Sequence, residues 1–141
     1  MKRTLSTNIN SNAVSFWLFV ARVAIGLFML THGIPKLQSL MSGHVKFADP
    51  FGIGATPSLI LSVFAEFICS VLLILGLAVR LAAIPLIINM LTAIFIALGG
   101  QPFAKKELAL LYLLVYLGIF ILGAGKFSID HLIAGGKGRR R

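Results

Sequence analysis

Residues 14–33 read VSFWLFVARVAIGLFMLTHG, an apolar run with a single charged residue, Arg22, near its middle. As a helix rising 1.5 Å per residue, the run would be about 30 Å long, which matches the hydrocarbon core of a bilayer. A charged side chain at that depth is costly, so it must face a partner or a cavity. The run therefore predicts a membrane-spanning helix in which Arg22 points away from lipid.

Three further runs have spanning length: residues 58–78, 81–98 and 107–125. The chain is 58% hydrophobic and only 12% charged, with a mean hydropathy of +0.98, which excludes an ordinary soluble domain. We predict an all-α integral membrane four-helix bundle over residues 14–134. A polar N-terminal tail, residues 1–13, and a flexible basic C-terminal tail, residues 135–141, flank it.

The formal net charge is +9, but the basic residues cluster at the ends of the runs, where membrane orientation explains them better than nucleic acid does. One side of the predicted bundle carries twice as many basic residues as the other. The two sets are Lys2, Arg3, Arg80, Lys126, Lys137, Arg139, Arg140 and Arg141 against Lys36, Lys46, Lys105 and Lys106. We therefore expect a multi-pass protein of the bacterial cell inner membrane, with both termini cytoplasmic and no nucleic-acid partner.

Polar and small residues recur in the runs at steps of three and four, which places them on one face of each helix. In lipid such faces meet inside a bundle. Counted from the cytoplasmic side at 1.5 Å per residue, four polar residues fall near the midplane: Arg22, Glu66, Asn89 and Tyr116. We predict that they form a buried polar network or ligand site built on an Arg22–Glu66 ion pair. A purely structural role for the pair, fixing helix register, stays open.

A second polar group is expected at the outer mouth of the bundle, with His32, Lys36 and Glu107 as its site residues and His44, Lys46 and Asp49 beside them. The outer loop of residues 37–57, which carries Phe47 and Phe51, is expected to form a structured, partly apolar lid. The single cysteine, Cys69, shares a helix face with Glu66, so it should be buried and cannot form an intramolecular disulfide. No two histidines fall at facing depths, which argues against a bis-histidine haem, and we predict no metal site.

Several of these residues form a pattern that resembles the DoxX family of small four-span membrane proteins. The matching features are Arg22 with Gly26, His32, Gly33 and Lys36; Glu66 with Gly76 and Arg80; Glu107; and GAGKFSID at residues 123–130. The resemblance covers residues 16–130 and implies a four-helix bundle in the bacterial cytoplasmic membrane. It also implies redox work, since some relatives serve quinone-linked thiosulfate oxidation and others serve thiol or oxidative-stress complexes. This chain has a single cysteine and so lacks the cysteine pair that an independent thiol oxidase would use.

These features favour a membrane subunit of an oxidoreductase system that binds a quinone-like or other small apolar redox molecule between helices. Two alternatives stay open: a small-molecule permease or binding protein, and a membrane scaffold that recruits a soluble enzyme. The expected partners are the lipid bilayer, a soluble or membrane redox protein, and a second copy of the chain.

Overall fold

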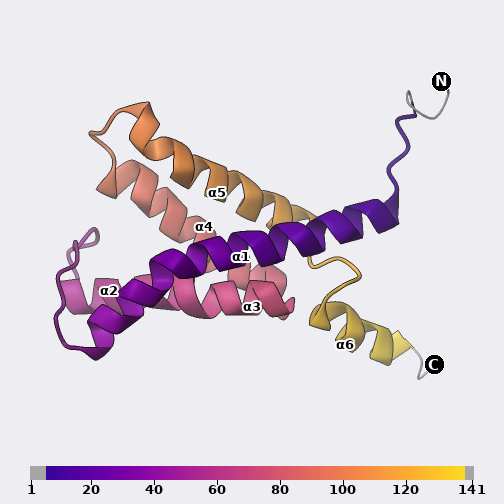
Figure 1. Ribbon diagram of the computed structural model, residues 1–141, viewed down its shortest axis with the longest axis horizontal. Coiled ribbons are helices and arrows are strands. Elements are labelled where there is room, and N and C mark those ends of the chain that lie inside the picture. Colours follow the sequence, from indigo (N-terminus) through magenta and orange to yellow (C-terminus); the bar gives the residue numbers. More distant parts are fainter. Residues whose placement is uncertain (1–5, 139–141) are drawn as a thin grey trace.

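The chain is helical throughout the part that the computed structural model describes, residues 6–138 (Figure 1). No strand occurs among these residues. The elements are α1 (Ser11–Met41), α2 (Ala55–Val63), η1 (Phe64–Cys69), α3 (Ser70–Leu75), α4 (Val79–Thr92), η2 (Ala93–Ala97), α5 (Phe103–Leu122) and α6 (Ile129–Gly138). The π-helical stretch η1 follows α2 and precedes α3 without a break, and η2 follows α4 without a break, so α2–η1–α3 and α4–η2 are each one continuous helix.

Three of these helices are long and apolar enough to cross a membrane: α1, α2–η1–α3 and α4–η2. This confirms the first three predicted runs, although α1 continues to Met41, well beyond the predicted end at residue 33. Helix α5 differs because Lys105, Lys106 and Glu107 occupy its first turns. Its uncharged part, residues 108–122, is about 22 Å long at 1.5 Å per residue, shorter than a typical hydrocarbon core.

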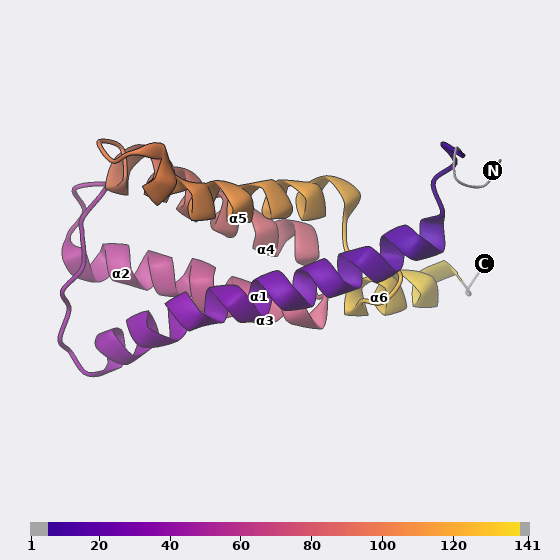
Figure 2. The ribbon, with the colours of Figure 1, turned by 45° about the horizontal axis from the view of Figure 1, so that its top comes forward.

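The helices lie side by side along the long axis of the molecule (Figure 2). Helix α1 packs on α2–η1–α3, and α4 packs on α5 and on η1. The turn between α3 and α4 is tight because Gly76 and Ala78 both adopt positive φ, at 73° and 49°. The set of helices has two ends. The loop end holds residues 42–54 and 98–102, and the terminal end holds the start of α1, the 76–78 turn and α6.

The core lies where α1, α3, α4 and α5 meet. Its buried side chains are Ile25, Met29, Cys69, Leu73, Val79, Ala82, Leu86, Met90, Tyr112, Tyr116 and Ile119. The predicted burial of Cys69 is confirmed. Large apolar side chains also cover the outside, including Trp17, Phe28, Phe95 and Leu114, each at least half exposed. Such an apolar exterior suits contact with acyl chains rather than with water.

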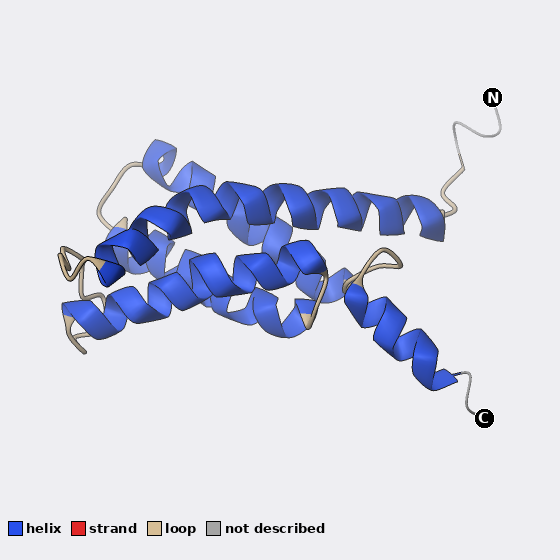
Figure 3. Ribbon diagram, turned by 60° about the horizontal axis from the view of Figure 1, so that its bottom comes forward, coloured by secondary structure: helices blue, strands red, loops and turns tan. Residues whose placement is uncertain are grey.

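Helix α6 was not predicted. It lies at the terminal end, past the ends of α3 and α5, and points away from the other helices (Figure 3). Its first turn is capped by Ser128, whose Oγ accepts a hydrogen bond from the His131 amide at 3.1 Å. The C-terminal tail predicted to be flexible from residue 135 is therefore helical as far as Gly138. Residues 1–5 and 139–141, which carry five of the eight basic residues counted above for orientation, lie outside the described residues.

Gly33 lets α1 approach η1 closely. A Cβ at this position would lie 2.8 Å from the Glu66 carbonyl oxygen and 3.1 Å from the Phe67 amide nitrogen, both rigid backbone atoms. Small residues allow this kind of backbone contact between helices in lipid. Gly33 therefore sets the separation of α1 and η1 at the level of Glu66.

We predict that Gly33→Ala lowers the thermal unfolding midpoint in detergent, with a cost of about 1–3 kcal/mol from overpacking. Gly118→Ala is the matched control, because Gly118 lies in α5 with no heavy atom within 4 Å of a Cβ placed there. That control should be neutral or slightly stabilising, since alanine favours a helix by about 1 kcal/mol over glycine. Equal midpoints for the two variants would contradict the close contact.

Candidate functional site

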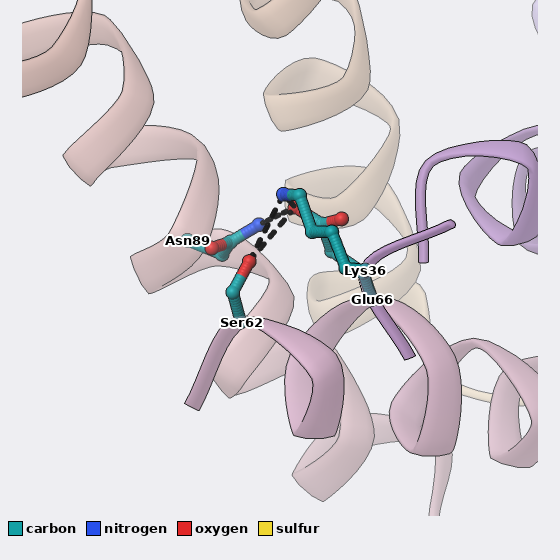
Figure 4. Close-up of polar contacts among 4 residues, drawn as sticks. All are labelled: Lys36, Ser62, Glu66 and Asn89. Atoms are coloured by element: carbon teal, nitrogen blue, oxygen red, sulfur yellow. Dashed lines mark hydrogen bonds and ion pairs between the residues drawn. The ribbon is translucent and has the colours of Figure 1, made fainter. Parts of the chain in front are cut away.

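Glu66 is the centre of a polar cluster formed by three helices (Figure 4). Its Oε1 accepts hydrogen bonds from Lys36 Nζ at 2.6 Å, from Asn89 Nδ2 at 2.8 Å and from Ser62 Oγ at 3.3 Å. Lys36 Nζ also donates to Ser62 Oγ at 3.0 Å. Among residues 6–138, Lys36–Glu66 is the one ion pair. The cluster joins α1, α2–η1 and α4 at a single carboxylate oxygen.

The direction of helical side chains explains why Lys36 reaches Glu66. Side chains on a helix lean toward its N-terminus. Helices α1 and α2–η1–α3 are antiparallel, so Lys36 leans from the loop end toward the interior and Glu66 leans from the interior toward the loop end. Ser62 precedes Glu66 by four residues and lies on the same face of the helix. Glu66 itself belongs to η1, and short π-helical segments are frequent at functional sites.

Glu66 is almost completely buried, with 5% of its side chain exposed, whereas Lys36 is 29% exposed. The second carboxylate oxygen, Oε2, is buried and has no hydrogen-bond partner among the described residues. The same is true of Arg22 Nε, Ser70 Oγ and Tyr116 Oη. Of these four groups, only Glu66 lines the large pocket described next. Glu66 is therefore the one residue of these four that a molecule bound in that pocket could contact.

A pocket of about 730 Å³ lies over the cluster, between α2–η1, α4–η2 and the 42–54 loop. Its walls are mostly apolar, and its polar side chains are few. The polar lining residues are Lys36, Asp49, Ser58, Ser62, Glu66, Asn89 and Thr92, and the apolar ones include Phe47, Pro50, Phe51, Leu61, Phe64, Pro85, Ile88 and Ile96. This size and this combination of an apolar wall with convergent polar groups are typical of small-molecule sites.

The loop of residues 42–54 is fixed against the pocket by Asp49. Its carboxylate accepts hydrogen bonds from the Gly54 amide at 2.8 Å, the Ile53 amide at 3.0 Å and the Ser58 hydroxyl at 3.0 Å. These donors, the Gly54 amide foremost, lower the pKa of Asp49 below its usual value. On the same loop, the Phe47 ring centroid lies 5.4 Å from Lys36 Nζ, within cation–π range. The loop thus caps the pocket beside the ion pair.

Arg22 does not pair with Glu66, so the predicted ion pair is wrong. Its guanidinium donates to the Leu73 carbonyl at 2.8 Å and to the Phe127 carbonyl at 2.6 Å. Depth counted along the chain misses the direction of side chains: Arg22 leans toward the terminal end while Glu66 leans toward the loop end. Lys36, about 21 Å further along α1 at 1.5 Å per residue, takes the predicted place of Arg22.

The other predicted residues are divided between the cluster and its surroundings. Asn89 contacts Glu66 as expected. Tyr116 is fully buried but packs on Tyr112, with ring centroids 6.0 Å apart, and does not line the pocket. Of the three residues predicted at the outer mouth, Lys36 turns inward. His32 is exposed and lies edge-on to Tyr112 at 6.2 Å, and Glu107 is exposed on α5.

Sequence reasoning missed the role of Ser62, and the signal was available, because Ser62 precedes Glu66 by four residues on the same stripe. Phe47 and Asp49 lie in the loop expected to form a lid, but the contact of Phe47 with Lys36 and that of Asp49 with Ser58 were not predicted. Both belong to a loop, where helical spacing gives no information about contacts.

Comparison with known proteins places the chain among membrane proteins. The DoxX family model matches residues 17–99, which include α1 from Trp17 through η2 and hence the whole polar cluster. An uncharacterized protein of Haemophilus influenzae is 31% identical over 123 residues, covering 82% of this chain and 90% of its own length. An uncharacterized membrane protein of Mycobacterium tuberculosis is 31% identical over 131 residues, covering 80% and 78%. No solved structure matches the chain.

We predict strong energetic coupling between Lys36 and Glu66. Lys36→Met or Glu66→Gln alone should lower the unfolding midpoint in detergent, because each leaves the partner's charge without its counter-ion inside the bundle. The double variant should recover part of the loss, giving a coupling energy of about 0.5–3 kcal/mol in a double-mutant cycle.

The matched control for this cycle is the pair Arg22→Met and Glu66→Gln. These residues share no hydrogen bond in the structure, so their effects should add within about 0.5 kcal/mol. Coupling in the Arg22 cycle with additivity in the Lys36 cycle would overturn the arrangement of the cluster.

Proposed function

The chain belongs to the DoxX family of membrane proteins, and we propose that it is a membrane subunit of an oxidoreductase system that binds a quinone-like molecule in the pocket over Glu66. One observation carries the proposal: the buried Glu66 carboxylate borders a large apolar pocket with one of its oxygens free. An apolar molecule with a polar head would fill the walls and satisfy this oxygen.

The hydrogen-bonding capacity of the pocket floor fits a carbonyl or hydroxyl head group. An ammonium group has three donors, and Lys36 uses two of them, on Glu66 and on Ser62. The third can be donated to a ligand carbonyl. Glu66 Oε2 can accept from a ligand hydroxyl. A donor and an acceptor side by side suit both the carbonyl form and the hydroxyl form of a quinone.

The position of the pocket favours a ligand that dissolves in lipid. Four of its apolar lining residues are also about half exposed: Leu61 at 52%, Phe64 at 46%, Ile88 at 53% and Ile96 at 50%. These residues come from α2–η1 and α4–η2, so the pocket borders the surface that we assign to acyl chains. A molecule could pass between bilayer and pocket through this side without crossing water.

A quinone, when bound, supplies the two-electron chemistry, and the residues of this chain hold its head group and manage protons. Lys36 is the donor and Glu66 the acceptor nearest the head group in this arrangement. Because Cys69 is a single buried thiol, the chain has no cysteine pair that could pass electrons as a dithiol. A soluble or membrane redox protein would therefore exchange electrons with the bound quinone.

We further propose that α5 crosses the membrane as a fourth helix, completing a four-helix bundle with both termini in the cytoplasm of the bacterial inner membrane. The start of α1, the Arg80 turn and α6 all lie at the terminal end (Figure 1). At the loop end, Lys36 turns inward to Glu66, which leaves Lys46, Lys105 and Lys106 there. The sequence carries eight basic residues on the side of the terminal end against these three. Because lysine and arginine near span ends set orientation, this excess favours a cytoplasmic terminal end.

The orientation predicts that alkaline phosphatase fused after residue 141 is inactive in intact cells, whereas a fluorescent protein fused there is bright. Phosphatase inserted in the 42–54 loop, next to residue 44, should be active. The opposite result at both positions would invert the protein, and activity at both would remove α5 from the set of spanning helices.

The ligand proposal predicts that a short-chain quinone binds the purified protein and that Glu66→Gln weakens binding about tenfold, equivalent to 1.4 kcal/mol. Lys36→Met should do the same, because each change removes one polar contact to the head group. Isothermal titration in detergent measures the affinities. Glu107→Gln is the matched control: it removes the same charge from an exposed residue outside the pocket and should bind as the unchanged protein does.

Failure of the unchanged protein to bind any quinone, by titration and by native mass spectrometry from gentle detergent, would contradict the proposal. Equal weakening by Glu107→Gln and Glu66→Gln would assign the effect to net charge and not to the pocket. Thermal unfolding of each variant separates loss of the site from loss of the fold.

A further inference from the structure

A second pocket, of about 460 Å³, lies at the terminal end, far from the Glu66 cluster along the helices. It forms where the start of α4, the chain between α5 and α6, and the first turn of α6 meet the start of α1. Its lining residues are Ser15, Ala78, Val79, Arg80, Leu81, Leu122, Gly123, Ala124, Gly125, Lys126, Asp130 and His131. None of these residues takes part in the function proposed above.

The basic residues of this pocket keep their charges available. Arg80 Nη2 donates to the Ile121 carbonyl at 3.3 Å, and Lys126 Nζ donates to Asn12 Oδ1 at 2.6 Å. Both acceptors are neutral, and within residues 6–138 neither cation forms an ion pair with a carboxylate. The hydrogen bonds hold the two cations in place without cancelling their charge.

Asp130, the one acid that lines the pocket, faces the backbone. Its Oδ1 accepts from the Ala78 amide at 2.7 Å and its Oδ2 accepts from the Val79 amide at 2.9 Å. These bonds cap the N-terminus of α4, so the site does not depend on a free helix end. His131 adds a third basic group on the same side. The balance of the pocket is positive.

The position of Gly123 orients one of the cations. A Cβ at this glycine would lie 3.3 Å from both Nε and Nη2 of Arg80, so the guanidinium lies close to a backbone that carries no side chain there. Gly123 has a φ of 87°, which a glycine adopts without strain. Gly123 thus leaves room for the Arg80 side chain beside the pocket.

The surroundings of the pocket are apolar and exposed. Leu81 is 70% exposed and Leu122 is 57% exposed, and both line the pocket. Phe127, next to Lys126, is 56% exposed, and α6 continues this surface with Leu132 at 73%. Basic groups beside exposed apolar side chains at the end of spanning helices are found where a protein meets the headgroup region of a bilayer.

We propose that this pocket binds the phosphate of an anionic phospholipid, with Arg80 and Lys126 as the phosphate ligands and Leu81 and Leu122 against the acyl chains. A guanidinium and an ammonium together suit a phosphate diester, since arginine binds two of its oxygens and lysine adds a point charge. The apolar walls favour a lipid over a soluble phosphate, because only the lipid fills both parts of the site.

The test uses the full chain in detergent and compares phosphatidylglycerol with phosphatidylcholine as added lipid. The unfolding midpoint should rise more with phosphatidylglycerol, and native mass spectrometry should retain that lipid preferentially. In the variant that combines Arg80→Gln with Lys126→Gln, phosphatidylglycerol should bind at least tenfold more weakly, and the preference between the two lipids should vanish.

Two controls keep the test specific. A variant that combines Lys46→Gln with Lys105→Gln removes the same charge from exposed residues at the loop end and should keep the preference. Arg80→Lys with Lys126→Arg keeps the charge and should retain most of the binding. The unfolding midpoint of each variant in phosphatidylcholine alone reports whether it is folded.

Three results would overturn the proposal. The first is equal stabilisation by both lipids in the unchanged protein. The second is loss of the preference in the Lys46→Gln, Lys105→Gln control, which would assign it to net charge. The third is an equal midpoint rise with inorganic phosphate alone, which would make the pocket a site for a soluble anion instead of a lipid.

Discussion

A carboxylate inside an apolar bundle must be given donors, and this requirement at Glu66 sets the arrangement of three helices. Its Oε1 collects hydrogen bonds from Lys36 on α1, Ser62 on the same helix and Asn89 on α4. A burial this deep is tolerated only when donors converge from several directions. Gly33 supports the convergence, because it lets α1 come against the backbone of η1 one turn before Lys36.

Arg22 gives the terminal end a comparable fixed point by different chemistry. Its guanidinium joins the last turn of α3, at the Leu73 carbonyl, to the chain before α6, at the Phe127 carbonyl. Asp130 completes the connection: its amide donates to the Gly76 carbonyl at 2.9 Å while its carboxylate caps α4. A buried cation that uses backbone carbonyls needs no acidic partner, which is why Arg22 and Glu66 can each be buried without meeting.

The sequence predicted the helices that hydropathy can detect and the residues that helical spacing can place on one face. The first three runs and the inward position of Glu66, Asn89 and Cys69 followed from these rules because lipid imposes a single constraint on the whole span. The pairing of Glu66 with Lys36 instead of Arg22 did not follow from these rules. Arg22 and Lys36 lie on the same stripe of α1, and the direction in which side chains lean decides between them, which spacing alone does not encode.

Helix α6 and the contacts of the 42–54 loop over the Glu66 pocket were not predicted, for two other reasons. Helix α6 contains Gly135, Gly136 and Gly138, whose low helix propensity predicts a flexible tail. Ser128 caps its first turn, and Asp130 ties that turn to the 76–79 segment of the protein. The pocket depends on the 42–54 loop folding back onto α2–η1 and α4–η2. Its Asp49 contacts run to Ile53, Gly54 and Ser58, and helical periodicity carries no information on them.

The two buried charged residues, Arg22 and Glu66, differ in their relation to the pockets. Arg22 is completely buried, bonds to two backbone carbonyls and also keeps one atom, Nε, without a partner, but it lines neither pocket. Glu66 places all of its hydrogen bonds on Oε1, leaves Oε2 without a partner among the described residues, and lines a large pocket. A buried free acceptor is costly to keep, so its place is explained when a molecule in the pocket donates to it. That asymmetry favours Glu66, and not Arg22, as the residue through which this membrane protein acts.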